Sequence, residues 1–193
     1  MTEKLKTADA PREGLATIGD LLRRFSGKEK KILVLDLACG EGSKMKYFSG
    51  SNFKVISIDK SKDMIKTALK KIPNRENTEF IIVDIKNAEF GKNIFDLIIA
   101  VGILHFLPKT DALNVISKMK RWTKRGGYNF ISVFRGKDRQ LAQKNGMHLF
   151  AEGEIKRKYS DWMIEYYKEF SFLDKIHDKP HVHEVFHIMA RKR

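Results

Sequence analysis

The sequence predicts an α/β fold in which a mostly parallel, doubly wound sheet carries helices on both faces. Short apolar runs of strand length alternate along the chain with helix-length amphipathic segments, a pattern typical of parallel sheets. The first run, 31–38, leads directly into a turn that contains Gly40 and Gly42, and the next run ends in Asp59. An apolar strand followed by a glycine turn and a helix presents a nucleotide-sized ligand at the carboxyl edge of such a sheet.

The first half of the chain is predicted to begin with an amphipathic helix and to continue into the sheet. Pro11 suits the first turn of a helix, and apolar residues then recur at helical spacing. Ser61 is a suitable cap for a later helix, which Pro73 ends. The predicted elements are a helix over 11–25, a strand over 31–38, a helix after Gly42, a strand over 53–59, a helix from Ser61 with Met64, Ile65, Ala68 and Leu69 as its buried stripe, and a strand over 78–84.

The second half continues the alternation and closes with a hairpin. The predicted elements are a strand over 94–101, a helix that begins at Thr110 or Asp111 and stops at Gly126 and Gly127, a strand over 128–134, a loop and helix over 136–160, and strands over 162–170 and 182–190. No repeat or linker divides the chain. We therefore expect one domain over 1–193, with an N-terminal helix in 1–27, a ligand-binding core in 30–135 and a substrate side in 136–193.

Acidic residues stand at consecutive strand ends. Asp59 follows Gly40 by 19 residues, which places it to accept hydrogen bonds from ribose hydroxyls, and Asp84 ends the third strand. A dinucleotide turn of the form G-x-G-x-x-G would need glycine at Met45, so a pyrophosphate-binding turn is the weaker interpretation. Simpler roles stay open: Asp36 could cap the turn through backbone hydrogen bonds, and the other two acids could cap helices.

These motifs together resemble the class I S-adenosylmethionine-dependent methyltransferases over residues 30 to 135. The turn D-x-A-C-G-E-G at 36–42 is similar to that family's first motif, with Ala38 where glycine is usual, and the stretch 124–127 resembles its Gly-Gly turn. The resemblance implies a Rossmann-like, seven-stranded, three-layer sandwich with strand order 3-2-1-4-5-7-6, and S-adenosyl-L-methionine as the cofactor. The expected cofactor-binding residues are Asp36, Ala38, Gly40, Gly42, Asp59, Lys60, Asp84, Ile85, Ala100 and His105.

The tail from Phe150 onward resembles the tellurite-resistance-type methyltransferases, which implies a histidine-lined substrate side. His177, His181 and His183 are therefore the expected substrate residues, and His105 and His177 are the expected catalytic ones. If the acceptor carries a proton, a histidine of near-neutral pKa would serve as its general base. We expect no metal site, because His187 lies roughly 13 Å along a strand from His183.

Composition indicates a globular protein with one strong bias. The 193 residues are 42% hydrophobic, and no apolar stretch approaches the roughly 18 residues of a membrane span, so no membrane association is expected. Cys39 is the only cysteine, which favours a cytoplasmic protein, and we interpret it as a small residue filling a strand end rather than as a nucleophile. The net charge of +14 suits a solvated surface, or attraction of an anionic ligand.

Three functions are compatible with these features. The first is a small-molecule methyltransferase, with an anionic acceptor drawn in by the positive charge. The second is an RNA or protein methyltransferase that docks through its basic surface. Nucleic acid is less favoured, because the aromatic residues lie mostly inside apolar runs and no N-P-P-Y signature follows the fourth strand. The third is a cofactor-binding protein without catalysis, or a dinucleotide enzyme. The pattern does not determine an oligomeric state.

Overall fold

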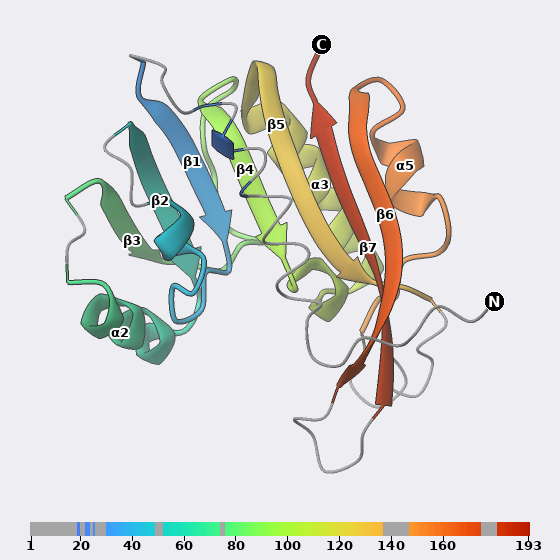
Figure 1. Ribbon diagram of the computed structural model, residues 1–193, viewed down its shortest axis with the longest axis horizontal. Helices are drawn as coiled ribbons and strands as arrows, with labels where there is room; N and C mark the ends of the chain where they lie inside the picture. The colour runs from blue at the N-terminus through green and yellow to red at the C-terminus, as the bar shows by residue number, and fades with distance from the viewer. Residues whose placement is uncertain are drawn as a thin grey trace.

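The computed structural model describes a single seven-stranded sheet with short helices packed on it (Figure 1). The described residues are 19, 22–23, 25, 30–48, 52–73, 76–136, 147–174 and 181–193. The strands run in the order β3-β2-β1-β4-β5-β7-β6. Their bounds are β1 Ile32–Leu37, β2 Phe53–Asp59, β3 Thr78–Ile82, β4 Phe95–Val101, β5 Thr123–Phe134, β6 Met163–Asp174 and β7 His181–Arg191. The predicted fold class and strand order are confirmed.

The central strands are parallel, and the hairpin at one end is not. Strands β3, β2, β1, β4 and β5 pair in parallel, whereas β7 pairs antiparallel with both β5 and β6. Val34, Leu35 and Leu37 of β1 have no exposed surface, because helices or loops cover both faces of the sheet there. Because β1 is buried on both faces of the sheet, nearly all of its residues are apolar.

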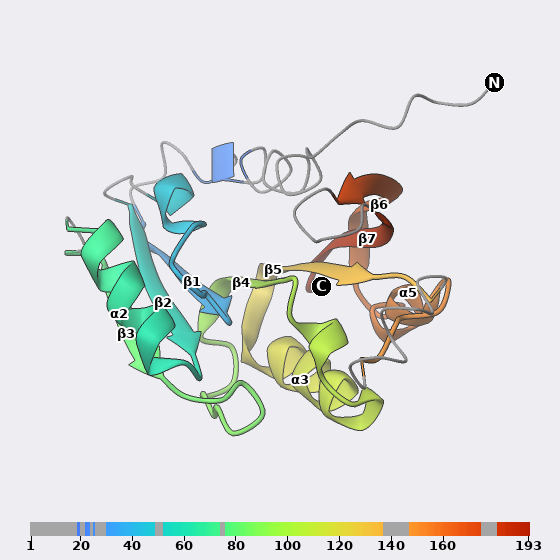
Figure 2. The ribbon, with the colours of Figure 1, turned by 90° about the horizontal axis from the view of Figure 1, so that it is seen from below.

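The sheet separates two hydrophobic clusters, and different elements cover each of them (Figure 2). The helices are η1 Met45–Phe48, α2 Lys62–Lys71, η2 Leu104–Phe106, α3 Lys109–Trp122 and α5 Glu154–Lys158. On one side, α3 and α5 pack over a cluster that includes Trp122 and Tyr159. On the other side, η1 packs over a cluster that also receives Leu22 and Phe25. This is the expected three-layer arrangement.

The helix from Ser61 forms as predicted. Ser61 is its N-cap, and the Ser61 hydroxyl accepts a hydrogen bond from the Met64 amide at 3.3 Å. The helix ends at Lys71, two residues before Pro73. Its buried stripe is narrower than predicted: Ile65 and Ala68 are buried, but Met64 is 41% exposed.

Other boundaries differ from the prediction. The turn at Gly42 is followed by the single 3₁₀ turn η1 rather than by an α-helix, since only ten residues separate Gly42 from the start of β2. Helix α3 begins at Lys109 and already ends at Trp122, because Thr123 pairs with Phe95 and begins β5. The pairing then jumps to Leu97 with Tyr128, so the predicted Gly-Gly turn at 124–127 is an irregularity inside β5.

The closing hairpin is longer than predicted, because β6 and β7 pair as far as Asp174 with His181. Most of the N-terminal helix predicted over 11–25 lies outside the described residues, as does 137–146 of the predicted substrate side. Among the helices that the described ranges contain, none has the length and apolar character needed to cross a membrane.

Candidate functional site

The residues of interest meet at the carboxyl edge of the parallel strands. Pairing of Leu37 with Ile58 on one side and with Ala100 on the other brings the ends of β1, β2 and β4 to one level. The Cys39 amide donates to the carbonyl of Ile58, which carries the glycine turn across the end of β2. A sheet edge of this kind is where open α/β folds bind ligands.

The glycine turn adopts a left-handed backbone at three positions. Ala38, Gly40 and Gly42 have φ of 53°, 55° and 77°. A Cβ atom added at Gly40 would meet no described atom within 4 Å, whereas one at Gly42 would lie 2.6 Å from Cδ1 of Ile72. Gly40 therefore leaves open space beside the main chain, and Gly42 allows α2 to pack against the turn.

Asp59 holds the glycine turn in place. One carboxylate oxygen of Asp59 accepts a hydrogen bond from the Gly40 amide at 2.9 Å, and the other accepts from the Ser61 amide at 2.8 Å. The side chain thereby links the end of β2 both to the turn and to the start of α2. The residue as a whole is largely buried, with 9% of its surface exposed.

Asp36 does not cap the turn, which corrects one of the alternatives predicted for it. Its side chain is fully buried, and among the described residues neither carboxylate oxygen receives a hydrogen bond. The nearest cation is Lys44, whose Nζ lies 3.4 Å from Oδ1 of Asp36 and whose own side chain is 8% exposed. Burial raises the pKa of the Asp36 carboxyl above its usual value, and the charge of Lys44 opposes that rise.

The role of Lys44 was not predicted from the sequence. It stands between Gly42 and the buried Met45 in a turn with other lysines, where a lysine usually faces solvent. The one available signal was that Asp36, at the end of a buried strand, would need a cation within reach.

Cys39 has the structural role that we predicted for it. Its side chain is buried, and burial, together with the nearby carboxylates of Asp36 and Asp59, raises the pKa of the thiol to about 12. A thiol that stays protonated at neutral pH is a poor nucleophile.

The remaining predicted cofactor residues lie at the same edge but are not equally accessible. Asp84 is half-buried, and one of its carboxylate oxygens accepts from the Lys86 amide at 2.9 Å. Ile85 is buried and Lys60 is exposed. The side chain of Ala100 packs inside the first hydrophobic cluster, so this residue can face a ligand only through its main chain.

A second group of residues lies where the loop after β4 meets the ends of β5 and β7. The rings of His105 and Phe134 stack with centroids 4.0 Å apart, and His183 stacks on Phe134 at 4.5 Å. His105 and His183 are 1% and 3% exposed. Phe106, next to the buried His105, is 55% exposed. It is an apolar surface residue beside this group that was not predicted from the sequence.

The surroundings of His105 oppose the general-base role predicted for it. Its Nδ1 accepts a hydrogen bond from the Phe134 amide at 3.3 Å, so the ring proton lies on Nε2. Burial, with a smaller effect from His183, lowers the pKa of His105 to about 3. Nε2 is buried and has no hydrogen-bond partner among the described residues. In this arrangement Nε2 is a hydrogen-bond donor, and burial opposes uptake of a second proton by the ring.

The other histidines divide between described and undescribed positions. His177 lies outside the described residues, and His181 is described only as the first residue of β7. His183 and His187 are buried and Val182 is 43% exposed, but the alternation stops there, because all residues from Val185 to Ala190 are buried. The described residues contain no group of three metal-ligating side chains.

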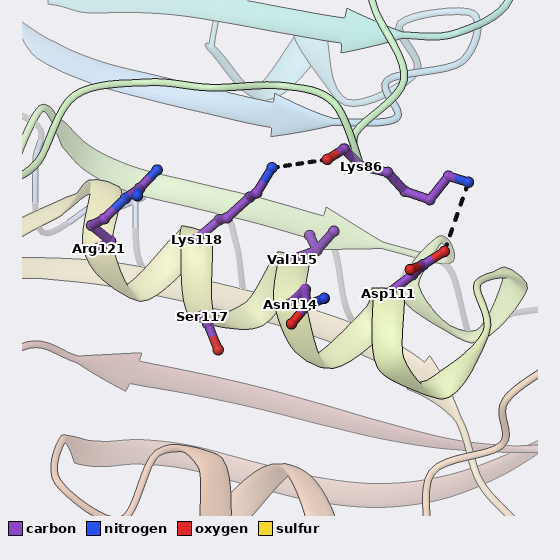
Figure 3. A pocket seen from close by; sticks show the side chains of 7 residues that line it. All are labelled: Lys86, Asp111, Asn114, Val115, Ser117, Lys118 and Arg121. Carbon is purple, nitrogen blue, oxygen red and sulfur yellow. Dashed lines mark hydrogen bonds and ion pairs between the residues drawn. The ribbon is translucent and has the colours of Figure 1, made fainter.

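Two surface hollows lie away from the glycine turn. One lies between α3 and the loop after β3 (Figure 3). Two of its lysines already have partners: Nζ of Lys118 donates to the carbonyl of Lys86, and Nζ of Lys86 lies 3.7 Å from Oδ2 of Asp111. The other, of about 430 Å³, lies at the opposite edge of the sheet beside Gly126 and Met163 and is lined by arginines and Lys192. Neither contains a predicted site residue.

The fold is the one that solved S-adenosylmethionine-dependent methyltransferases also have. Residues 28–182 match the family model described as tellurite resistance protein TehB. This match covers most of the chain, and the chain therefore belongs to the TehB family. The probable S-adenosyl-L-methionine-dependent methyltransferase TehB of Haemophilus influenzae is 32% identical over 138 residues, which cover 70% of this chain and 48% of that protein. The chain spans about half the length of the curated relatives it matches.

Solved structures agree with this assignment. The crystal structure of TehB from Haemophilus influenzae superposes with a TM-score of 0.77 at 25% identity and covers 92% of this chain and 62% of that chain. The N-methyltransferase NodS from Bradyrhizobium japonicum, solved in complex with S-adenosyl-L-homocysteine, has the same fold, with a TM-score of 0.72 at 16% identity over 97% of this chain and 89% of that chain.

Proposed function

We propose that this protein transfers a methyl group from S-adenosylmethionine to a small anionic acceptor. The observation that carries the proposal is the hydrogen bond from the Gly40 amide to Asp59, which fixes an open glycine turn beside an acid at the end of the second strand. This arrangement suits a nucleoside that lies across the strand ends with its sugar at the acid.

The residues at this edge fit the cofactor. Within the described part of the chain the buried carboxylate oxygens of Asp36 have no hydrogen-bond donor, and the cofactor carries an ammonium group that could supply one. Asp59 and Asp84 would hold the adenosine, and the turn at 40–42 would hold the methionine end. Open space beside Gly40 allows a ligand to approach the main chain there.

When bound, S-adenosylmethionine supplies a methyl group that is already activated by its positively charged sulfur. The task of the chain is therefore to bind, orient and exclude water, and orientation alone can contribute up to roughly 7–11 kcal/mol. Residues after β4, at the end of β5 and at the start of β7 are suited to bind the acceptor, since His105 and His183 both stack on Phe134.

The surroundings of His105 support an acceptor that needs no general base. A nucleophile that must lose a proton needs a base, and this imidazole has its Nδ1 lone pair occupied. An anion that already carries a reactive lone pair needs none, and the net charge of +14 attracts anions. The name of the matching family, tellurite resistance protein, supports an oxyanion as acceptor.

The test is methyl transfer from radiolabelled cofactor to separate acceptor pools. The purified chain is incubated with methyl-labelled S-adenosylmethionine and, in turn, with tellurite, selenite, a small thiol, cellular RNA and cellular protein. We expect label in a small-molecule product from an oxyanion or thiolate. Label in RNA or protein alone would overturn the acceptor class. Calorimetry showing binding of NAD but not of S-adenosylhomocysteine would overturn the cofactor.

A further inference from the structure

The surface hollow of about 430 Å³ at the edge of the sheet opposite the glycine turn is lined mainly by cations. Its described lining residues are Arg125, Gly126, Met163, Arg191, Lys192 and Arg193. They come from the start of β5, the start of β6 and the end of β7, which lie side by side there (Figure 1). Four of these six residues are basic and none is acidic.

The other hollow, between α3 and the loop after β3, shows that this chain neutralises the cations of a comparable surface. There, Nζ of Lys118 lies 2.6 Å from Oε1 of Glu89, and a terminal nitrogen of Arg121 lies 2.5 Å from Oε2 of the same side chain. The cations at the opposite edge therefore differ from the lysine-rich surface in general.

The carboxylate closest in charge to the basic hollow pairs with a lysine outside its lining. Asp161 interacts with the charge of Arg193, but its Oδ1 lies 2.5 Å from Nζ of Lys120. Arg125 is exposed and forms no ion pair with any described residue. The positive charge of the lining is thus only partly offset.

Lys192 contributes charge to this hollow but no free hydrogen-bond donor. Its Nζ donates to Oδ1 of Asn93 at 3.0 Å and to the carbonyls of Lys120 and Thr123 at 2.8 and 2.7 Å, which uses all three of its hydrogens. Burial, and then the charges of Lys120 and Arg125, lower the pKa of Lys192 below its usual value. The surrounding cations outweigh the nearby carboxylate at this point.

The guanidinium of Arg191 is held in one orientation. Its Nε donates to the Gly126 carbonyl at 3.3 Å, and the group lies 5.9 Å from the centroid of the Tyr128 ring. A Cβ atom added at Gly126, whose φ is 74°, would lie 3.7 Å from a terminal nitrogen of Arg191. Because glycine has no side chain, that nitrogen stays uncovered on this side.

The arrangement favours a small anion with several oxygens. Guanidinium groups form paired hydrogen bonds with phosphate oxygens, and several of them around one hollow suit a multiply charged group. A surface for single-stranded nucleic acid would add exposed aromatic rings, but Tyr128 and Trp162 are only 8% and 5% exposed. The volume lies in the range of roughly 300–1,000 Å³ that is typical of small-molecule pockets.

We propose that Arg125, Arg191 and Arg193 bind a small molecule that carries a phosphate or pyrophosphate group. This site is separate from the edge at which the cofactor and the acceptor are proposed to bind, and it shares no residue with that edge. The inference therefore goes beyond the proposed function and does not depend on it.

The test is calorimetry on the full chain with pyrophosphate at constant ionic strength. We expect equal pyrophosphate affinity with and without S-adenosylhomocysteine. Arg125→Gln should weaken pyrophosphate binding by about five-fold or more, as for loss of a strong exposed ion pair. The matched control is Arg121→Gln, which removes the same charge from a side chain already paired with Glu89 and should leave the affinity unchanged.

A second measurement locates the ligand on the unaltered chain. In a nuclear magnetic resonance titration, pyrophosphate should shift the amide signal of Gly126 and leave that of Gly40 unchanged. A shift at Gly40 in place of Gly126 would overturn the inference, because the anion would then bind at the glycine turn.

Three calorimetric outcomes would also overturn the inference. They are no binding of pyrophosphate, equal losses of affinity in Arg125→Gln and Arg121→Gln, and binding of a defined single-stranded RNA without binding of pyrophosphate. Each of these outcomes leaves the cofactor assignment standing, since that assignment is tested by the binding of S-adenosylhomocysteine.

Discussion

His105 and Phe134 contact each other in two ways. Their rings stack with centroids 4.0 Å apart, and the Phe134 amide donates to Nδ1 of His105 at 3.3 Å. His183 also stacks on Phe134, with an interplanar angle of 9°. Three distant segments of the chain are thus joined at one point, and the His105 imidazole is fixed in one tautomer.

The pKa of His105 predicts a specific pH dependence of stability. In the unfolded chain a histidine takes up a proton near pH 6.5, whereas in the folded chain the pKa of His105 is about 3. The unfolded state therefore binds more protons between these values, so stability is present above pH 6.5 and is lost as the pH falls. We expect His105→Gln to show a shallower fall in Tm than the unaltered chain between pH 6.5 and 4. Parallel Tm curves would contradict this prediction.

Asp59 and its neighbour Ser61 should affect different properties. Asp59→Ala removes the acceptor that holds the Gly40 amide, and we expect S-adenosylhomocysteine affinity to fall by roughly 1.5–3 kcal/mol. Ser61→Ala removes the cap of α2 and should lower stability by about 1 kcal/mol with little change in affinity. Calorimetry and urea unfolding of both variants measure the two effects. An unchanged affinity in Asp59→Ala would exclude this residue from the cofactor site.

The two glycines of the turn should respond differently to alanine. Both have positive φ, so each substitution carries a backbone strain of roughly 1–2 kcal/mol. Gly42→Ala should cost more stability, because its Cβ would lie 2.6 Å from Ile72 and 3.3 Å from Ala68. Gly40→Ala should instead weaken S-adenosylhomocysteine binding, because its Cβ fills the open side of the turn. The prediction fails if Gly40→Ala proves the less stable of the two variants.

Ala38 offers a substitution to glycine that should stabilise the chain. Its φ of 53° is unfavourable for alanine, and glycine adopts it without strain. We expect Ala38→Gly to raise the free energy of unfolding by up to about 1 kcal/mol, since relief of strain exceeds the added flexibility of the unfolded chain. The matched control is Ala112→Gly inside α3, which should lower the free energy of unfolding by about 1 kcal/mol. Denaturant titration should show a higher free energy of unfolding for Ala38→Gly and a lower one for Ala112→Gly. A lower value for both variants would show that the backbone at Ala38 is not strained.

Much of the fold and part of the site could be predicted from local patterns. The strand ends at Asp59 and the cap at Ser61 were predicted correctly, since they depend on apolar runs and on hydrogen bonds between near neighbours. The boundary between α3 and β5 was predicted wrongly. Thr123 joins the sheet through Phe95, a partner 28 residues away, and helical periodicity carries no information about that pairing.

The sequence by itself determined the order of the elements and which strand ends carry acidic residues, because those features follow from periodicity and turn chemistry along the chain. Only the tertiary structure decided which role each of these acidic side chains has. Asp59 holds the glycine turn, while Asp36 lies buried against Lys44. The tertiary structure also decided that Nδ1 of His105 accepts from the Phe134 amide, which leaves the ring proton on Nε2. Hydrogen-bond partners and desolvation depend on which distant segments come together, and burial sets the charge that a side chain can carry.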